Sequence, residues 1–143
     1  MEIEIKSRSA TKRAFLSAIV PFIAKELNLA ESKYTLIVHT EGKLRNSMGC
    51  EGVIFKTGEK ELTMFVDTAL TLSSMLLTVA HEMVHVKQYA KGQLKSIMNS
   101  RGQSKLFWFG KSWSHVGYDD YPWEKEAFRR QSELALSVMK CVK

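Results

Sequence analysis

The sequence has little cysteine, little proline and no long hydrophobic run, and each shortage excludes a class of protein. Its two cysteines, Cys50 and Cys141, are not spaced as Cys-x-x-Cys and do not make a disulfide framework. No apolar run approaches the roughly 18 residues that span a bilayer. The first residues, MEIEIKSRSATKR, lack the apolar stretch of a secretory signal. We therefore expect a cytoplasmic protein with reduced thiols and no membrane contact.

Repeats, low-complexity segments and linkers are also absent. A chain of 143 residues is long enough to bury one sizeable core and too short for two comfortable ones. The hydrophobic fraction of 45% and the charged fraction of 25% are those of an ordinary soluble globular protein. We predict a single domain over residues 1–143.

One long segment contains no acidic residue: neither Asp nor Glu occurs between Met83 and Tyr118. Basic charge with interleaved aromatic rings suits single-stranded nucleic acid, whose phosphates pair and whose bases stack. It also suits a lid over an active site, whereas the ordinary alternative is a solvated basic surface with the aromatic rings buried in the core. We favour burial for the rings and keep nucleic-acid binding by residues 87–113 as a hypothesis. The segment contains the basic residues Lys87, Lys91, Lys95, Arg101, Lys105 and Lys111 and the aromatic residues Phe107, Trp108, Phe109 and Trp113.

Apolar residues at three- and four-residue steps predict three helices. They cover residues 9–29, residues 72–91 and a segment that begins near Pro122, a residue suited to a first helical turn. Pro21 lies inside the first of these patterns, where its missing N–H should kink the helix or split it in two.

Runs rich in β-branched and apolar residues predict three strands, at 33–40, 53–57 and 61–67. The short connection between the last two favours an antiparallel hairpin. Glycine-containing stretches at 41–52 and 92–121 are interpreted as loops. The predicted fold is of the α+β class: a helix, a three-stranded mainly antiparallel sheet, a second helix, a long loop and a C-terminal helix.

The segment VAHEMVHVKQ contains two histidines four residues apart with a glutamate between them. On a helix, His81 and His85 lie on one face and can present imidazole nitrogens to one metal ion. Glu82 is one step round the helix, where it can hold a water beside the ion without binding the ion itself. Two histidine ligands one turn apart and a glutamate beside them are what the H-E-x-x-H motif of zinc peptidases provides. Chance spacing on an amphipathic helix is the ordinary alternative, so a third ligand has to be found.

Five downstream side chains are candidates for the third ligand: His115, Asp119, Asp120, Glu124 and Glu126. A step of about 100° per residue places Glu124 within the apolar stripe of the last helix and points Glu126 away from that stripe. A carboxylate on a buried face is costly unless a charge receives it, and a metal ion would do so. Glu124 is therefore preferred, and His115 stays the rival because a loop residue cannot be placed from the sequence.

The segments HEMVH and PWEKEA together resemble the gluzincin-type zinc metallopeptidases. More narrowly, they are similar to the small SprT-like and ImmA-like peptidase domains of bacteria and phages. In such domains an HExxH helix packs on a small sheet, and a later helix that opens with Glu-x-x-Ala or Glu-x-Glu-Ala brings the third ligand. The resemblance implies a minimal zincin-like domain in which His81, His85 and Glu124 bind Zn²⁺ and Glu82 is the general base.

The resemblance also implies an activity, that of an endopeptidase that hydrolyses peptide bonds of a protein or peptide substrate with zinc-activated water. Two alternatives stay open: a SprT-like protease acting on DNA-bound proteins through residues 87–113, and a non-catalytic binding protein stabilised by zinc. Two departures from the family pattern are visible. SprT itself uses a third histidine, which favours His115, and Phe128 occupies the position where several gluzincins carry an acid that orients a histidine ligand.

The sequence suggests further parts of an active site. Tyr118, Tyr121 and His115 precede the last helix and are candidates for stabilising an oxyanion, although a structural role is the commoner one for a tyrosine. The strand ELTMFVD comes directly before the HEMVH helix, and an extended peptide could add beside such a strand.

Overall fold

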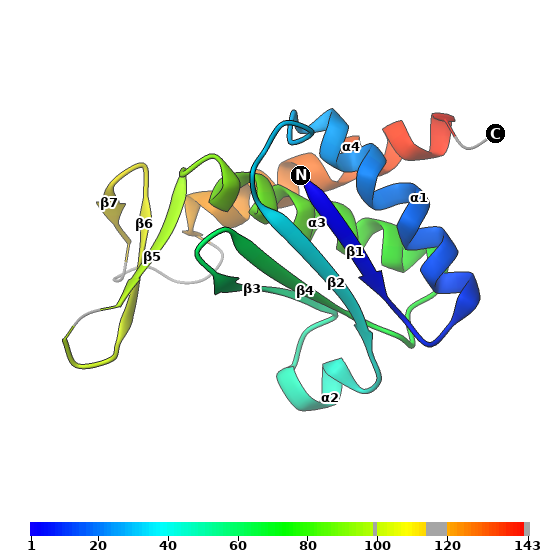
Figure 1. The fold of residues 1–143 in the computed structure, drawn as a ribbon, viewed down its shortest axis with the longest axis horizontal. Coiled ribbons are helices and arrows are strands. Elements are labelled where there is room, and N and C mark those ends of the chain that lie inside the picture. Colours follow the sequence, from blue (N-terminus) through cyan, green and yellow to red (C-terminus); the bar gives the residue numbers. More distant parts are fainter. Residues whose placement is uncertain (99, 114–119, 142–143) are drawn as a thin grey trace.

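Three long helices, one short helix and two β-sheets make up the described part of the structure (Figure 1). The computed structural model describes residues 1–98, 100–113 and 120–141, with residue 45 described by its backbone alone. The architecture is α+β, as the sequence predicts. The elements are, in order, β1 (Glu2–Lys6), α1 (Ala10–Glu26), β2 (Thr35–Glu41), α2 (Leu44–Met48), β3 (Gly52–Gly58), β4 (Glu61–Asp67), α3 (Leu72–Ala90), β5 (Leu94–Met98), β6 (Ser104–Trp108), β7 (Lys111–Ser112) and α4 (Pro122–Cys141).

The larger sheet has four strands in the order β1-β2-β4-β3. β1 is parallel to β2 and β2 is parallel to β4, whereas β3 and β4 form the antiparallel hairpin that their short connection predicts. The expectation of three mainly antiparallel strands is therefore wrong. The missing strand is EIEIK at the N-terminus, where Ile3 pairs with Leu36 and Ile5 pairs with Val38. Its partner β2 follows after the crossover helix α1, and a crossover of this kind joins parallel strands.

One hydrophobic core lies between this sheet and the helices. Leu36 and Leu62 are register partners on β2 and β4, and both are fully buried together with the apolar sides of α1, α3 and α4. Pro21 was expected to kink the first helix or to split it in two. The split does not occur, because α1 is one helix that includes Pro21. Pro21 lies on the exposed side of the helix, where the unmade hydrogen bond is close to water. No helix of the described residues is long and apolar enough to span a membrane.

A second sheet occupies much of the segment that was expected to be a loop. β5, β6 and β7 form an antiparallel three-stranded sheet that projects from the end of α3 on the side away from α1 (Figure 1). Leu94 pairs with Trp108, and both lie on the face of this sheet that turns toward α4, since Trp108 packs its ring 6.3 Å from that of Trp123. The expected burial of the aromatic residues is wrong for Phe109, which is 68% exposed. The five-residue helix α2 likewise lies in an expected loop.

The strand ELTMFVD, β4, is not at a sheet edge. It pairs with β2 on one side and with β3 on the other, so no extended peptide can add beside it. Among the described strands of this sheet, the two edges are β1 and β3. β3 is the edge that packs against α3. The prediction that a peptide adds beside β4 is therefore wrong, and β3 is the strand beside which one could add.

Gly52 lets the start of β3 approach α3 closely. A Cβ atom at this position would lie 2.6 Å from Thr78 Cγ2 and 3.2 Å from Glu82 Cγ. The first distance is shorter than side-chain carbon contacts allow, and Thr78 is β-branched, so its methyl group has little freedom to move. The absence of a side chain at residue 52 therefore sets the distance between the edge strand and Glu82.

Replacing Gly52 by alanine should destabilise the protein by about 1–3 kcal/mol, because the added methyl group overpacks the contact with Thr78. The free energy of unfolding, measured by urea titration, checks this expectation. The double variant Gly52→Ala, Thr78→Ser removes the Thr78 methyl group and should recover part of the loss.

Gly42→Ala is the matched control, because a Cβ at residue 42 meets nothing within 4 Å. Gly42→Ala should unfold at the same urea concentration as the unmodified protein. If Gly52→Ala does so as well, the added methyl group meets no tight contact, which contradicts the close approach of β3 and α3.

Candidate metal centre

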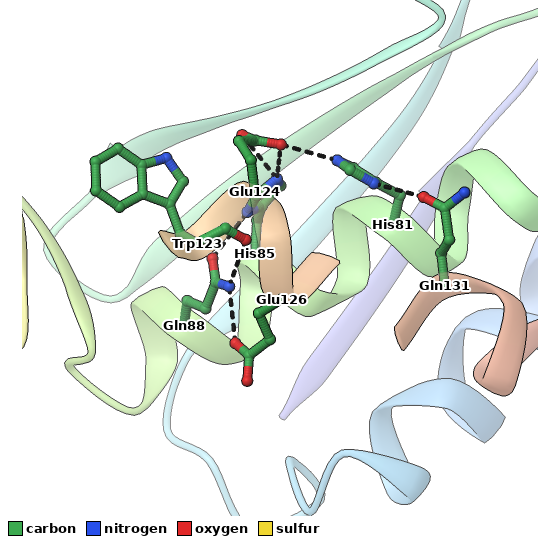
Figure 2. A network of polar contacts seen from close by, with 7 residues as sticks. All are labelled: His81, His85, Gln88, Trp123, Glu124, Glu126 and Gln131. Carbon is green, nitrogen blue, oxygen red and sulfur yellow. Dashed lines mark hydrogen bonds and ion pairs between the residues drawn. The ribbon is translucent and has the colours of Figure 1, made fainter. Parts of the chain in front are cut away.

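Two histidines of α3 and one glutamate of α4 meet between these helices (Figure 2). His81 and His85 are one turn apart, so their rings project from the same side of α3. Glu124 lies in the first turn of α4, and its carboxylate reaches the Nε2 atoms of both rings. The donor atoms of the three side chains all lie within 4.8 Å of one another. The structure thus brings together the three residues that the sequence selects as ligands.

The spacing of the donor atoms suits a metal ion. His81 Nε2 lies 3.1 Å from Glu124 Oε1, and His85 Nε2 lies 3.2 Å from Glu124 Oε2. Neighbouring donors of a tetrahedral ion with bonds of about 2.0–2.1 Å are separated by about 3.3 Å. The three side chains are only 12%, 9% and 8% exposed, and a buried carboxylate is costly without a positive charge beside it. This group could therefore hold a metal ion.

The side-chain amide of Gln88 determines which nitrogen of His85 carries a proton. Gln88 is fully buried, and its Nε2 donates to the Trp123 carbonyl oxygen at 3.0 Å and to Glu126 Oε1 at 2.8 Å. Its Oε1 therefore faces His85 Nδ1, 2.8 Å away, and accepts a hydrogen bond from the N–H of that nitrogen. The free lone pair of a neutral His85 is thereby on Nε2, which points at Glu124 (Figure 2).

His81 has a corresponding partner on α4. Its Nδ1 lies 2.7 Å from Gln131 Oε1, while its Nε2 faces Glu124. Phe128, at the position where several gluzincins carry an acid, instead packs its ring against His81 with centroids 4.7 Å apart. Two neutral amides therefore orient the histidines, and they add no negative charge to the group.

This hydrogen-bond pattern requires a positive charge among the three side chains. Because His85 Nδ1 already donates to Gln88, Nε2 can donate to Glu124 only if the ring is protonated. Burial lowers the pKa of His85, but its hydrogen bond to Glu124 and the charges of Glu82 and Glu124 raise it by more. A metal cation would supply the same positive charge next to Glu124. Both imidazole rings would then be neutral, because a nitrogen that binds a metal must be unprotonated.

Glu126, the alternative carboxylate, contacts the last turn of α3. Its Oε2 accepts from Lys87 Nζ at 2.7 Å, and its Oε1 accepts from Gln88. Lys87 is therefore buried in an ion pair. It belongs neither to a solvated basic surface nor to the basic groups of residues 87–113 that could contact nucleic acid. Burial alone would raise the pKa of Glu126, but the hydrogen bonds from Lys87 and Gln88 lower it. Glu126 thus holds Gln88 in place and lies outside the group of donors.

Glu82 borders the three donors without joining them. It is 8% exposed and lines two neighbouring pockets, one on the His81 side of the group and one on the His85 side. Burial raises the pKa of Glu82, His85 and His81 oppose the rise, and Glu124 adds to it. A carboxylate with a raised pKa is a better proton acceptor than one in water, which is the property of a general base.

Two polar residues of α3 at the site were missed in the sequence. Gln88 and Tyr89 follow His85 by three and four residues, so both lie on its face of the helix. Tyr89 lines the same pocket as Glu82, His85 and Glu124. Burial and the charges of Glu124 and Glu82 raise the pKa of Tyr89, so its hydroxyl keeps its proton at neutral pH. The signal in the sequence was the continuation of the four-residue step from His81 through His85 to Tyr89.

The other sequence candidates are not part of the group. His115, Tyr118 and Asp119 lie outside the described residues. Asp120 is exposed and is not among the described residues that gather around a possible ion. Tyr121 stacks on Trp123, with ring centroids 4.4 Å apart, and lines neither pocket beside Glu82.

Comparisons with protein-family models, with curated proteins and with solved structures find no match to this chain.

Replacing Gln88 by methionine should weaken metal binding by about 10- to 100-fold, the usual effect of removing a group that orients a ligand histidine. Methionine keeps the shape of the side chain but cannot accept from His85 or donate to Glu126. The measurement is competition for Zn²⁺ against a chromophoric chelator. Gln103→Met, at an exposed position, is the matched control and should bind as tightly as the unmodified protein. Equal affinity of Gln88→Met and the control would contradict the role of this amide.

Proposed function

We propose that this protein is a zinc-dependent endopeptidase with a minimal gluzincin-type centre, similar to SprT-like and ImmA-like peptidases. The observation that carries the proposal is the buried group of His81, His85 and Glu124 with Glu82 beside it, at the junction of two pockets. Two imidazoles and one carboxylate are the donor set of several catalytic zinc sites. When bound, Zn²⁺ supplies a Lewis acid that polarises a carbonyl group and lowers the pKa of a water molecule.

Glu82 has the position of a general base. It is adjacent to the ligand histidines in sequence, does not belong to the donor group and faces the space on both sides of that group. Its raised pKa favours taking a proton from the attacking water and later donating it to the leaving amine. These two transfers are the acid–base work that hydrolysis of a peptide bond needs.

The number of donors favours a catalytic centre over a structural one. A structural zinc site uses four protein ligands, whereas a catalytic site uses three and keeps one position for substrate or water. Among the residues that the structure describes, three donors form the group. The two adjoining pockets would let a substrate approach an ion held by these donors, and a purely structural site does not need such access.

The edge strand β3 supplies a place for the substrate backbone. One side of β3 pairs with β4, and no other strand of the described residues pairs with its second side. Gly52, at its start, lines both pockets beside Glu82. An extended peptide that adds to β3 would pass over the donor group and place one peptide bond beside Glu82. The hydroxyl of Tyr89, which stays protonated, is the donor best placed in the described residues to stabilise an oxyanion.

Two substitutions test the proposal together. Glu82→Gln should retain one zinc ion per chain and lose at least about 100-fold in peptide hydrolysis, because it removes the proton acceptor and keeps the ligands. Glu124→Ala should lose both the metal and the activity. Metal content is measured by mass spectrometry, and hydrolysis is measured with a mixture of protein-derived peptides.

Glu133→Ala is the matched control, since it removes an exposed carboxylate from the same helix. If the zinc-loaded protein cleaves nothing, or if Glu82→Gln cleaves as fast as the unmodified protein, the peptidase proposal is wrong.

A second candidate function, binding of nucleic acid, has one specific observation in its favour. The register of β5 and β6 places Lys95 opposite Phe107 and Ile97 opposite Lys105, so two cations and two apolar side chains share one face. This face belongs to the sheet that projects from the end of α3 (Figure 1). Basic and aromatic groups on one surface suit a single strand of nucleic acid, and binding there would hold the peptidase near its substrates.

If this surface binds single-stranded DNA, the affinity should fall steeply with salt concentration. Replacing both Lys95 and Lys105 by glutamine should reduce the slope of log K against log salt by about 1.4, as expected for two lost phosphate contacts. Fluorescence anisotropy with a labelled oligonucleotide measures the slope, and Lys140→Gln on α4 is the control. Binding that does not depend on salt would exclude this candidate.

A further inference from the structure

We propose that the pocket on the His85 side of the centre receives a large apolar side chain of the substrate, so that cleavage occurs next to such residues. The inference rests on the proposed peptidase function and adds a substrate class to it. The pocket has a volume of about 300 Å³, at the lower end of the range for ligand pockets. That size suits a single side chain.

The walls of this pocket are mainly hydrocarbon. They come from four separate parts of the fold: the edge strand β3, the helix α3, the sheet of β5 and β6, and the first turn of α4. The apolar and aromatic residues that line it are Val53, Ile54, Tyr89, Leu94, Leu106 and Trp123. An apolar side chain that enters this space is removed from contact with water on several sides. Burial of a leucine or phenylalanine side chain contributes about 1.5–3 kcal/mol, which corresponds to roughly 10- to 150-fold in binding.

The second sheet builds one wall of the pocket and is held in position. Leu94, the first residue of β5, is 3% exposed, and its register partner Trp108 packs against Trp123. Trp123 directly precedes Glu124, and its carbonyl oxygen accepts the hydrogen bond from Gln88. The wall and the donor group are therefore connected through one residue, which keeps the pocket at a constant place relative to the reacting bond.

The apolar walls of the pocket disfavour a charged substrate residue. Tyr89, one of the lining residues, has a raised pKa because of burial first and of the charges of Glu124 and Glu82 second. An aspartate, glutamate or lysine of the substrate would lose its hydration against these walls.

The pocket on the other side of the centre is different in character. It shares Cys50, Gly52 and Glu82 with the first. Its lining combines the polar side chains of Glu51, Thr78 and Gln131 with the apolar ones of Leu77 and Phe128. The two sides of the reacting bond therefore have unlike surroundings. We expect the apolar preference at only one of the two substrate positions that flank the cut.

The first experiment is digestion of a mixture of protein-derived peptides with the zinc-loaded protein, followed by identification of each cut by mass spectrometry. The expected result is enrichment of Leu, Ile, Phe or Met by about tenfold or more at one flanking position. In the variant Leu106→Lys, the same position should change its preference to acidic residues. Leu106→Ala, a milder change, should keep the apolar preference and reduce it. Leu136→Lys, on an exposed part of α4 outside both pockets, should leave the preference and the rate unchanged.

The second experiment measures binding without cleavage. Titration calorimetry with Glu82→Gln should give a dissociation constant about tenfold or more lower for a peptide with leucine at the selected position than for the same peptide with aspartate. Cleavage without preference at either flanking position, or equal binding of the two peptides, overturns the pocket assignment and leaves the peptidase function standing. No cleavage of any peptide overturns the peptidase function, and the assignment falls with it.

Discussion

The geometry of the site depends on the buried amide of Gln88. This amide lies on α3, accepts a hydrogen bond from His85 Nδ1–H, and donates to both a carbonyl oxygen and a carboxylate of α4. It therefore orients a ligand histidine and joins the two helices that carry the ligands. Because its oxygen and nitrogen have fixed and different partners, the amide cannot be turned over without losing three hydrogen bonds. The ion pair of Lys87 with Glu126 fixes the carboxylate that accepts one of these hydrogen bonds.

The packing of α3 on α4 makes the donor group, and the two sheets make the space around it. β3 reaches Glu82 because Gly52 has no side chain to hold it away. β5 and β6 close the other side through the contact of Trp108 with Trp123. The contacts that stabilise the fold thus leave pockets open beside three buried polar donors. The proposed hydrolysis needs such access for its substrate, whereas a structural metal site does not.

Helices and the hairpin were predictable from the sequence because their signals are local. The three- and four-residue steps of α1, α3 and α4 and the short connection of β3 and β4 involve neighbours along the chain. The parallel pairing of β1 with β2 was not, because the two strands are separated by a whole helix. The sheet of β5, β6 and β7 was not predictable either. Glycines interrupt this segment, and its short strands are half-buried or exposed except at Leu94, so they show no regular apolar alternation.

The sequence by itself determined that His81 and His85 share a helix face and that Glu124 belongs to the buried stripe of the last helix. Both statements follow from helical periodicity alone. Only the tertiary structure decided that these faces meet, that Glu126 pairs with Lys87 instead of joining the donors, and that Gln88, Gln131 and Tyr89 complete the surroundings. The reason is physical: periodicity fixes the direction of a side chain about its own helix axis, whereas its partner depends on how two helices are placed against each other.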